Sequence, residues 1–276
     1  MGMLGMGNET YLYLCGIKTS NEFCLRDNIF LVPHNGELNV DDVAKIVKSD
    51  VEFGVALLFA KSLSTSLKIV ANNSKELAVS SWNALWDLVL LSAVFHNEVI
   101  CNFQSNHSVE QFNKTSMLHI TNYHLRGFNS KTHDLTHDDI LWLEKHFANG
   151  IKLLEQNPFT VAVHSMATYK WHSLPRVQLA IIWAGIEALF AVSNEIAFRL
   201  SLNVSKFLSS PDSADETHHL FKVVKKLYGI RSKAVHGDKI KAGESKAVCD
   251  SAELLHKLII KIVEINSLPD EESLIF

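Results

Sequence analysis

The chain has 276 residues, of which 47% are hydrophobic and 20% charged, and its formal net charge is −4. This composition is that of a globular protein with a substantial core, long enough for one large or two ordinary domains. The acidic balance excludes a protein whose whole surface coats nucleic acid or an anionic membrane, because such surfaces need an excess of cations.

The first sixty residues predict a mixture of strands and helices. Residues 10–33 are rich in aromatic and branched side chains around a turn-like segment, which predicts two short strands. A short helix is predicted over Val40–Lys48, where Asn39 or Asp41 can cap the free amides. For Phe53–Ala60 the pattern is compatible with a strand and with a buried helix.

A long helix is predicted to begin at Ser74, because apolar side chains recur every three or four positions after it. Trp82 and Trp86 belong to this apolar stripe and are expected to anchor the core. Two further strands are predicted over Val99–Gln104 and Met117–His124. The N-terminal part of the chain therefore combines helices and strands.

The segment Arg126–Asp134 is polar and has no apolar period, which predicts a boundary between two domains. Residues 1–130 would form a mixed α/β domain of unknown role, and residues 135–276 an all-helical domain. Together they predict an α+β fold. Thr136 begins the second domain with a capping box, since Asp139 stands three residues later.

Five helices are predicted after the boundary, joined by short connections as in a helical bundle. The third is apolar nearly all round from Val177 to Val192 and is expected to be the central element. It could continue to Leu208 or be interrupted near Ser193. The predicted helices begin at Thr136, span Phe159–Trp171, begin at Ser173, span Asp215–Tyr228 and span Glu244–Ile265.

Neither a metal nor a cofactor is expected. His133 and His137 stand among aspartates, but acids in a first helical turn are explained by capping and by the helix dipole. The chain holds no Gly-rich phosphate loop, GxSxG elbow or HExxH motif. Four scattered cysteines without a CxxC pair predict reduced thiols and no thiolate zinc site: Cys15, Cys24, Cys101 and Cys249.

A cytoplasmic protein without a membrane partner is expected. The first ten residues lack the basic start and apolar run of a secretory signal. The longest apolar run, Val177–Val192, is broken by Gln178 and Glu187 and is shorter than the roughly 20 residues that cross a bilayer. We expect it to be a buried core helix.

The stretch Phe221–Gly237, FKVVKKLYGIRSKAVHG, concentrates the basic charge of the chain. In the twenty positions after Phe221, seven basic residues stand against one acid, Asp238. This asymmetry predicts a local anion site, with a solvated lysine face as the alternative.

Arg231 and His236 suit phosphodiester cleavage, because a guanidinium can hold two phosphate oxygens and imidazole titrates near neutrality. RNA supplies its own 2′-hydroxyl nucleophile, so the expected product is a 2′,3′-cyclic phosphate.

The wording YGIRSKAVHG resembles the HEPN superfamily, and most of all its Apea-like branch. The resemblance covers roughly residues 135–266 and implies a helical bundle that forms homodimers, bringing two Arg/His pairs into one cleft. In many members it also implies a metal-independent endoribonuclease of defence or toxin systems. By this resemblance, Arg231 binds the scissile phosphate and His236 acts as general acid/base. Ser232 and Glu187 would support them.

RNA is the expected partner. Glu187 stands alone among apolar residues, where an unpaired carboxylate is costly, so Arg231 or His236 is expected to pair with it. Ser232 follows the arginine at a position where many active members have Asn, Asp or His. Asp238 stands where members controlled by nucleotide transfer have Tyr.

The lysines expected to contact RNA are Lys222, Lys225, Lys226, Lys233 and Lys239.

Two alternatives stay open beside the nuclease: a non-catalytic HEPN module that binds RNA or a protein partner, and a purely structural dimerisation bundle.

The spacing of Arg231 and His236 leaves two ways in which the pair could form one site. On an uninterrupted α-helix, positions five apart point about 140° away from each other. Either the flanking glycines, Gly229 and Gly237, break the helix, or a second subunit completes the site.

Overall fold

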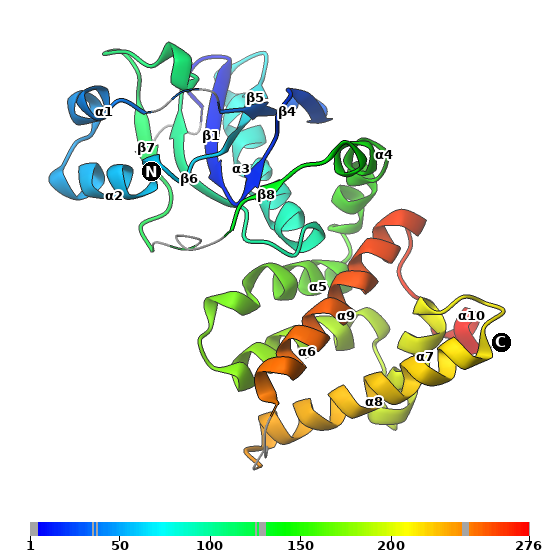
Figure 1. The fold of residues 1–276 in the computed structure, drawn as a ribbon. Helices are drawn as coiled ribbons and strands as arrows, with labels where there is room; N and C mark the ends of the chain where they lie inside the picture. The colour runs from blue at the N-terminus through cyan, green and yellow to red at the C-terminus, as the bar shows by residue number, and fades with distance from the viewer. Residues whose placement is uncertain are drawn as a thin grey trace. The chain divides into compact units, whose positions relative to one another are not determined.

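The structure is a computed structural model that describes residues 5–34, 36, 38–124, 126, 131–238 and 243–275. The chain divides into two compact units, residues Met1–Ala148 and Asn149–Phe276 (Figure 1). The first unit holds the strands, and the described part of the second is helical. The predicted α+β fold class is confirmed.

The first unit is built on a six-stranded antiparallel sheet with the strand order β3-β4-β5-β1-β6-β7. Its strands are β1 (Glu9–Cys15), β3 (Phe23–Arg26), β4 (Ile29–Pro33), β5 (Thr65–Val70), β6 (Ile100–Ser105) and β7 (Leu118–Ile120). β6 and β7 lie in the two segments predicted as strands, whereas β5 was not predicted. β1 is buried from Thr10 to Cys15, so both faces of the sheet are covered at this central strand.

Helices cover the sheet. α1 (Val40–Ile46) begins where predicted, and the Asn39 side chain accepts the amide of Asp41. The undecided segment is helical, as α2 (Asp50–Ala60). Side chains of both helices join Tyr13 and its neighbours in one core cluster. The long helix α3 (Ser74–Val94) packs against β5, β1 and β6, and a short 3₁₀ turn, η1 (Val109–Gln111), precedes β7.

The two tryptophans of α3 do not anchor the core, so that prediction was wrong. Trp82 is 52% exposed and Trp86 40% exposed. The buried face of α3 is centred on Leu77 and Leu88, and Trp82 and Trp86 lie about 140° and 180° around the helix from Leu77. α3 is apolar on more than one side, and in its first half the small residues Ser81 and Ala84 are buried where Trp82 and Trp86 are not.

Among the described residues, α3 is the one helix long and apolar enough to cross a membrane. Of its most apolar window, however, 56% is buried inside the structure. A core helix of a globular unit satisfies the same criteria, so this feature is weak evidence for a membrane span. The apolar run that the sequence singled out, Val177–Val192, lies largely in the buried helix α6 (Pro175–Phe190).

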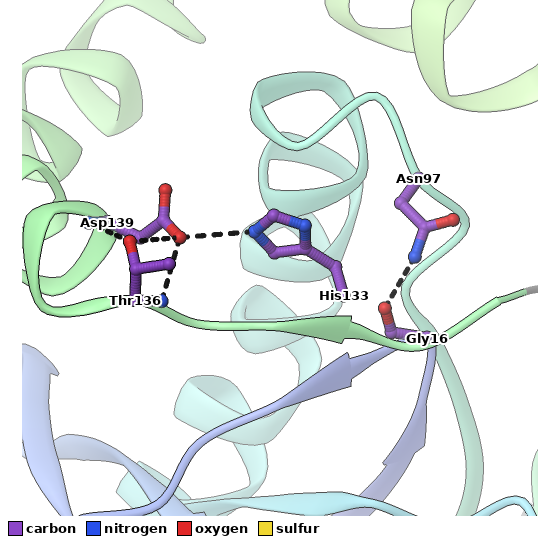
Figure 2. A network of polar contacts seen from close by, with 5 residues as sticks. All are labelled: Gly16, Asn97, His133, Thr136 and Asp139. Carbon is purple, nitrogen blue, oxygen red and sulfur yellow. Dashed lines mark hydrogen bonds and ion pairs between the residues drawn. The ribbon is translucent and has the colours of Figure 1, made fainter.

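The segment predicted as a domain linker is tied to the first unit (Figure 2). β8 (His133–Asp134) pairs in parallel with β2 (Ile17–Lys18). Nearby, the Asn97 side-chain amide donates to the carbonyl of Gly16 at 2.5 Å and to that of Lys131 at 2.7 Å. The compact units accordingly divide later than predicted, between Ala148 and Asn149. Residues 125 and 127–130 lie outside the described residues.

The capping box predicted at the start of α4 (His137–Leu153) is confirmed. The amide of Asp139 donates to Oγ1 of Thr136 at 3.1 Å, and the amide of Thr136 donates to Oδ2 of Asp139 at 2.9 Å. The same carboxylate oxygen lies 3.3 Å from Nε2 of His133, whose ring stacks on Phe95 (Figure 2). Hydrogen bonds from Thr136 and His133 lower the pKa of Asp139 below its ordinary value, although partial burial acts in the opposite direction.

The second unit is a set of helices around α6, which contacts α5, α7, α8 and α9 and is the central element, as predicted. Left-handed residues at Ala191 and Glu195 separate α6 from α7, so the predicted long helix is interrupted. The other elements are α5 (Asn157–Thr168), η2 (Tyr169–Trp171), α7 (Ile196–Leu208), α8 (Ala214–His236), α9 (Glu244–Ile265) and α10 (Glu271–Ile275). α9 has the bounds that the sequence predicted.

Candidate active site on helix α8

Helix α8 runs without a break from Ala214 to His236. The predicted end at Tyr228 was wrong, because Gly229 is accommodated inside the helix and does not break it. The hydroxyl of Ser213 accepts the amide of Glu216 at the N-terminus, and Gly237 ends the helix with a φ of 79°, a left-handed conformation that favours glycine. Arg231 and His236 therefore occupy the last two turns of one continuous helix.

Arg231 forms an ion pair with Glu187 of α6. Nη2 of Arg231 lies 2.9 Å from both carboxylate oxygens and donates a hydrogen bond to Oε2. The Arg231 side chain is 19% exposed and that of Glu187 is 30% exposed. Burial raises the pKa of Glu187 above its ordinary value, and the positive charge of Arg231 offsets part of this rise. Of the two partners expected for Glu187, the structure provides Arg231.

Two aromatic rings support the guanidinium. The guanidinium carbon of Arg231 lies 5.5 Å from the ring centre of Tyr228, a cation–π contact one turn earlier on α8. The buried Trp183 of α6 meets Tyr228 edge-on at 5.4 Å, and its Nε1 donates to the hydroxyl of Ser251 on α9 at 3.0 Å. Side chains from α6, α8 and α9 thus fix the position of Arg231.

Not every polar group of this arrangement is satisfied. Nε of Arg231 is buried and has no hydrogen-bond partner within the described part of the chain, whereas Oε1 of Glu187 is in ion-pair contact with Nη2 of Arg231 at 2.9 Å. An unsatisfied buried donor or acceptor costs about 1–3 kcal/mol. The unpaired Nε indicates that the pair is not optimised for stability alone.

His236 is exposed, as the last residue of α8. Because the helix is uninterrupted, its side chain points about 140° away from that of Arg231. The two residues do not share one helical face within a single chain. The half-buried Ser232 lies between them in sequence, about 40° around the helix from His236.

The lysines expected to bind RNA are arranged along α8. Lys222, Lys225, Lys226 and Lys233 are all exposed, whereas Lys239 lies outside the described residues. Lys225 Nζ lies 5.6 Å from the ring centre of Phe221, one turn earlier. Exposed lysines near one helical surface make a positive strip that can hold an anion.

Three residues near the motif were not singled out from the sequence. Tyr228 contacts Arg231, and Trp183 packs against Tyr228. Only the three-residue spacing of Tyr228 from Arg231 signals such a contact. Arg176, at the start of α6, donates from Nη2 to the carbonyl of Asp238 at 2.7 Å and lies 3.3 Å from Glu244. It thereby joins the ends of α8 and α9.

No protein-family model, curated protein or solved structure matches this chain. The HEPN resemblance therefore rests on the spacing of Arg231 and His236 and on their setting at the end of a helix in a helical unit. Geometry adds the ion pair with Glu187 to that setting. The nuclease activity, the RNA partner and the homodimer stay predictions.

Proposed function

We propose that the chain is a metal-independent endoribonuclease of the HEPN type. The observation that carries this proposal is the guanidinium of Arg231, held by Glu187 and Tyr228 about one and a half turns from an exposed His236. A positioned guanidinium can stabilise the charge that develops on a phosphate, and imidazole can transfer protons near neutral pH.

In the proposed reaction, the 2′-oxygen of the substrate attacks the adjacent phosphorus. The bond from phosphorus to the 2′-oxygen forms and the bond to the 5′-oxygen breaks, leaving a 2′,3′-cyclic phosphate and a 5′-hydroxyl. One proton leaves the 2′-hydroxyl and one is delivered to the 5′-oxygen. His236 is assigned to proton transfer, and Arg231 to the non-bridging phosphate oxygens.

A second copy of the chain is part of the proposal. Arg231 and His236 lie on different faces of α8, so one chain presents only one of them toward a given point. Two copies with their α8 ends together would place an arginine beside a histidine and would supply two imidazoles. One imidazole can then accept the proton while the other delivers one.

The test is incubation of the purified protein with diverse RNAs in EDTA, followed by analysis of the product ends. Cleavage with cyclic phosphate ends is expected, and His236→Ala should reduce it by about 10²-fold or more. Arg231→Lys keeps the charge but loses the planar donor fork and should also be strongly impaired. The matched control is His219→Ala, another exposed histidine of α8, which should cleave normally. Full activity of His236→Ala would overturn the assignment.

The second candidate function is a non-catalytic module that binds RNA. It is favoured by one observation, the engagement of Arg231 with Glu187 on a face that His236 does not share. This function predicts no cleavage of any RNA, with binding that weakens as salt rises. Reversing the charges at Lys225 and Lys226 should weaken that binding.

A further inference from the structure

From His218 to His236, one face of α8 carries basic, small and aromatic side chains without a single acid. We call it the α8 lysine face: the residues from His218 to His236 within about 60° of one line along the helix, namely His218, Phe221, Lys222, Lys225, Gly229, Ser232, Lys233 and His236. Asp215 lies at the edge of the same angular range, one turn before the face begins. Phe221 and Ser232 are half-buried and the others are exposed. The sequence from Thr217 to Gly237 holds no Asp or Glu. Arg231 lies outside this face.

Gly229 lies in the middle of the α8 lysine face, and the fold gives no reason for a glycine there. Its backbone is helical, and a Cβ atom added to it would meet no atom of the described residues within 4 Å. Glycine is also a poor helix former, inferior to alanine in a helix interior. An exposed glycine does allow another backbone to approach the helix closely.

The charge of the face decides what approaches it. Lys222, Lys225 and Lys233 lie within two turns of Gly229 and are exposed. A second copy docked on the middle of this face, around Gly229, would bring lysines against lysines, which is unfavourable. The contact between copies in the proposed function is confined to the ends of α8. A polyanion is complementary to it, because its phosphates release counterions when they meet the lysines.

An aromatic cleft lies at the other end of the face from His236. It has a volume of about 900 Å³ and is lined by Phe198 and Leu202 of α7 and by His218 and Phe221 of α8, among other residues. Phe198 is 50% exposed, and its ring centre lies 5.6 Å from that of Phe221. An exposed aromatic ring beside cations offers a stacking surface for an unpaired base.

We propose that a single strand of RNA lies along the α8 lysine face, with its sugar-phosphate backbone against Gly229 and a base in the cleft at Phe198. This inference rests on the proposed function and names its substrate as single-stranded. His236 and Phe221 are about 22 Å apart along the helix axis, so the strand is recognised well beyond the scissile bond. Duplex RNA, whose bases are paired and stacked, cannot supply the base to the cleft.

The test uses the whole protein and fluorescent oligonucleotides of about ten residues, single-stranded or paired, with affinity measured by anisotropy. Gly229→Ala should raise Tm by roughly 1–3 °C, since alanine favours the helix, yet weaken binding of the single strand by about fivefold. Gly54→Ala is the matched control: a Cβ at Gly54, inside α2, also meets no atom of the described residues within 4 Å. It should raise Tm and leave affinity unchanged.

Phe198→Ala should weaken binding of the single strand by about tenfold and leave the weaker duplex binding unchanged. Trp82→Ala, which removes a similarly exposed ring from the first unit, should have no effect. The inference is overturned if Gly229→Ala binds like the wild type, or if it changes only the oligomeric state. If both variants bind and cleave RNA as the wild type does, the inference is overturned and the proposed function still stands. A wild type that binds no RNA overturns both.

Discussion

The guanidinium of Arg231 on α8 is held by the carboxylate of Glu187 on α6, although 44 positions separate the two residues in the chain. Both side chains are partly buried, and such an ion pair adds little to stability, because desolvation offsets much of the attraction. The pair does fix the direction in which the guanidinium points. Its removal should therefore affect chemistry more than folding.

Glu187→Gln keeps the shape and the hydrogen-bond acceptor but removes the charge. We expect the free energy of unfolding to fall by about 1–2 kcal/mol, because Arg231 loses its counterion but stays partly exposed and keeps the Gln oxygen as an acceptor. RNA cleavage should fall by about 10-fold to 100-fold, because Arg231 is no longer held in place. Glu253→Gln, in an exposed pair with Lys257, serves as the control and should change neither quantity. Undiminished cleavage by Glu187→Gln would show that the pair is structural only.

Ser251→Ala removes the acceptor of the buried Trp183 N–H group. The unpaired donor should cost about 1–3 kcal/mol in the free energy of unfolding, measured by urea denaturation. In the double variant Trp183→Phe/Ser251→Ala, neither polar group is left unpaired, so its cost should be less than the sum of the single costs. Additive costs would mean that this hydrogen bond contributes nothing to stability.

Asp87 of α3 is fully buried beside Arg26, whose Nε lies 2.9 Å from Oδ1. Burial raises the pKa of Asp87 to about 6, although the hydrogen bond and charge of Arg26 act in the opposite direction. The folded state then holds a proton that the unfolded state has lost, between the ordinary value of 3.8 and about 6. Stability should fall as pH rises through this window, by up to about 3 kcal/mol.

The measurement for Asp87 is the difference in unfolding free energy between the wild type and Asp87→Asn across pH. The wild type should lose stability relative to the variant as pH rises from about 4 to 6, and the difference should be constant above that range. Parallel curves for the two proteins would exclude a raised pKa at this position.

Thr136→Ala removes the hydroxyl that accepts the amide of Asp139. The loss of an N-cap side chain costs about 1 kcal/mol, so Tm should fall, whereas Thr136→Ser should retain most of the stability. Differential scanning calorimetry of the two variants provides the test. Equal Tm values for Thr136→Ala and Thr136→Ser would show that the capping box contributes nothing to stability.

Sequence reasoning succeeded where a local rule decides the outcome. The capping box of Thr136 and Asp139 and the bounds of α9 follow from spacing alone. The cost of an isolated buried carboxylate predicted a partner for Glu187, and Arg231 is that partner. The role of the pair in chemistry cannot be deduced in this way.

Tertiary contacts decided the rest. α3 is apolar on several sides, so only the position of the sheet determines that Trp82 faces outward. Gly229 stays helical because the buried residues Val224, Leu227 and Ala234 pack along the same helix and outweigh one unfavourable propensity. β2 and β8 are two residues each and far apart in sequence, a pairing that no local pattern predicts.

The short parallel pairing of β2 with β8 has a consequence for truncation experiments. A fragment that ends within Arg126–Asp134, where the sequence suggests a linker, would lack the complete β8 and expose the backbone of Ile17 and Lys18. Any loss of function in such a fragment would then report misfolding, and would say nothing about what the first unit recognises. Point substitutions on the intact chain are the sounder genetic tool.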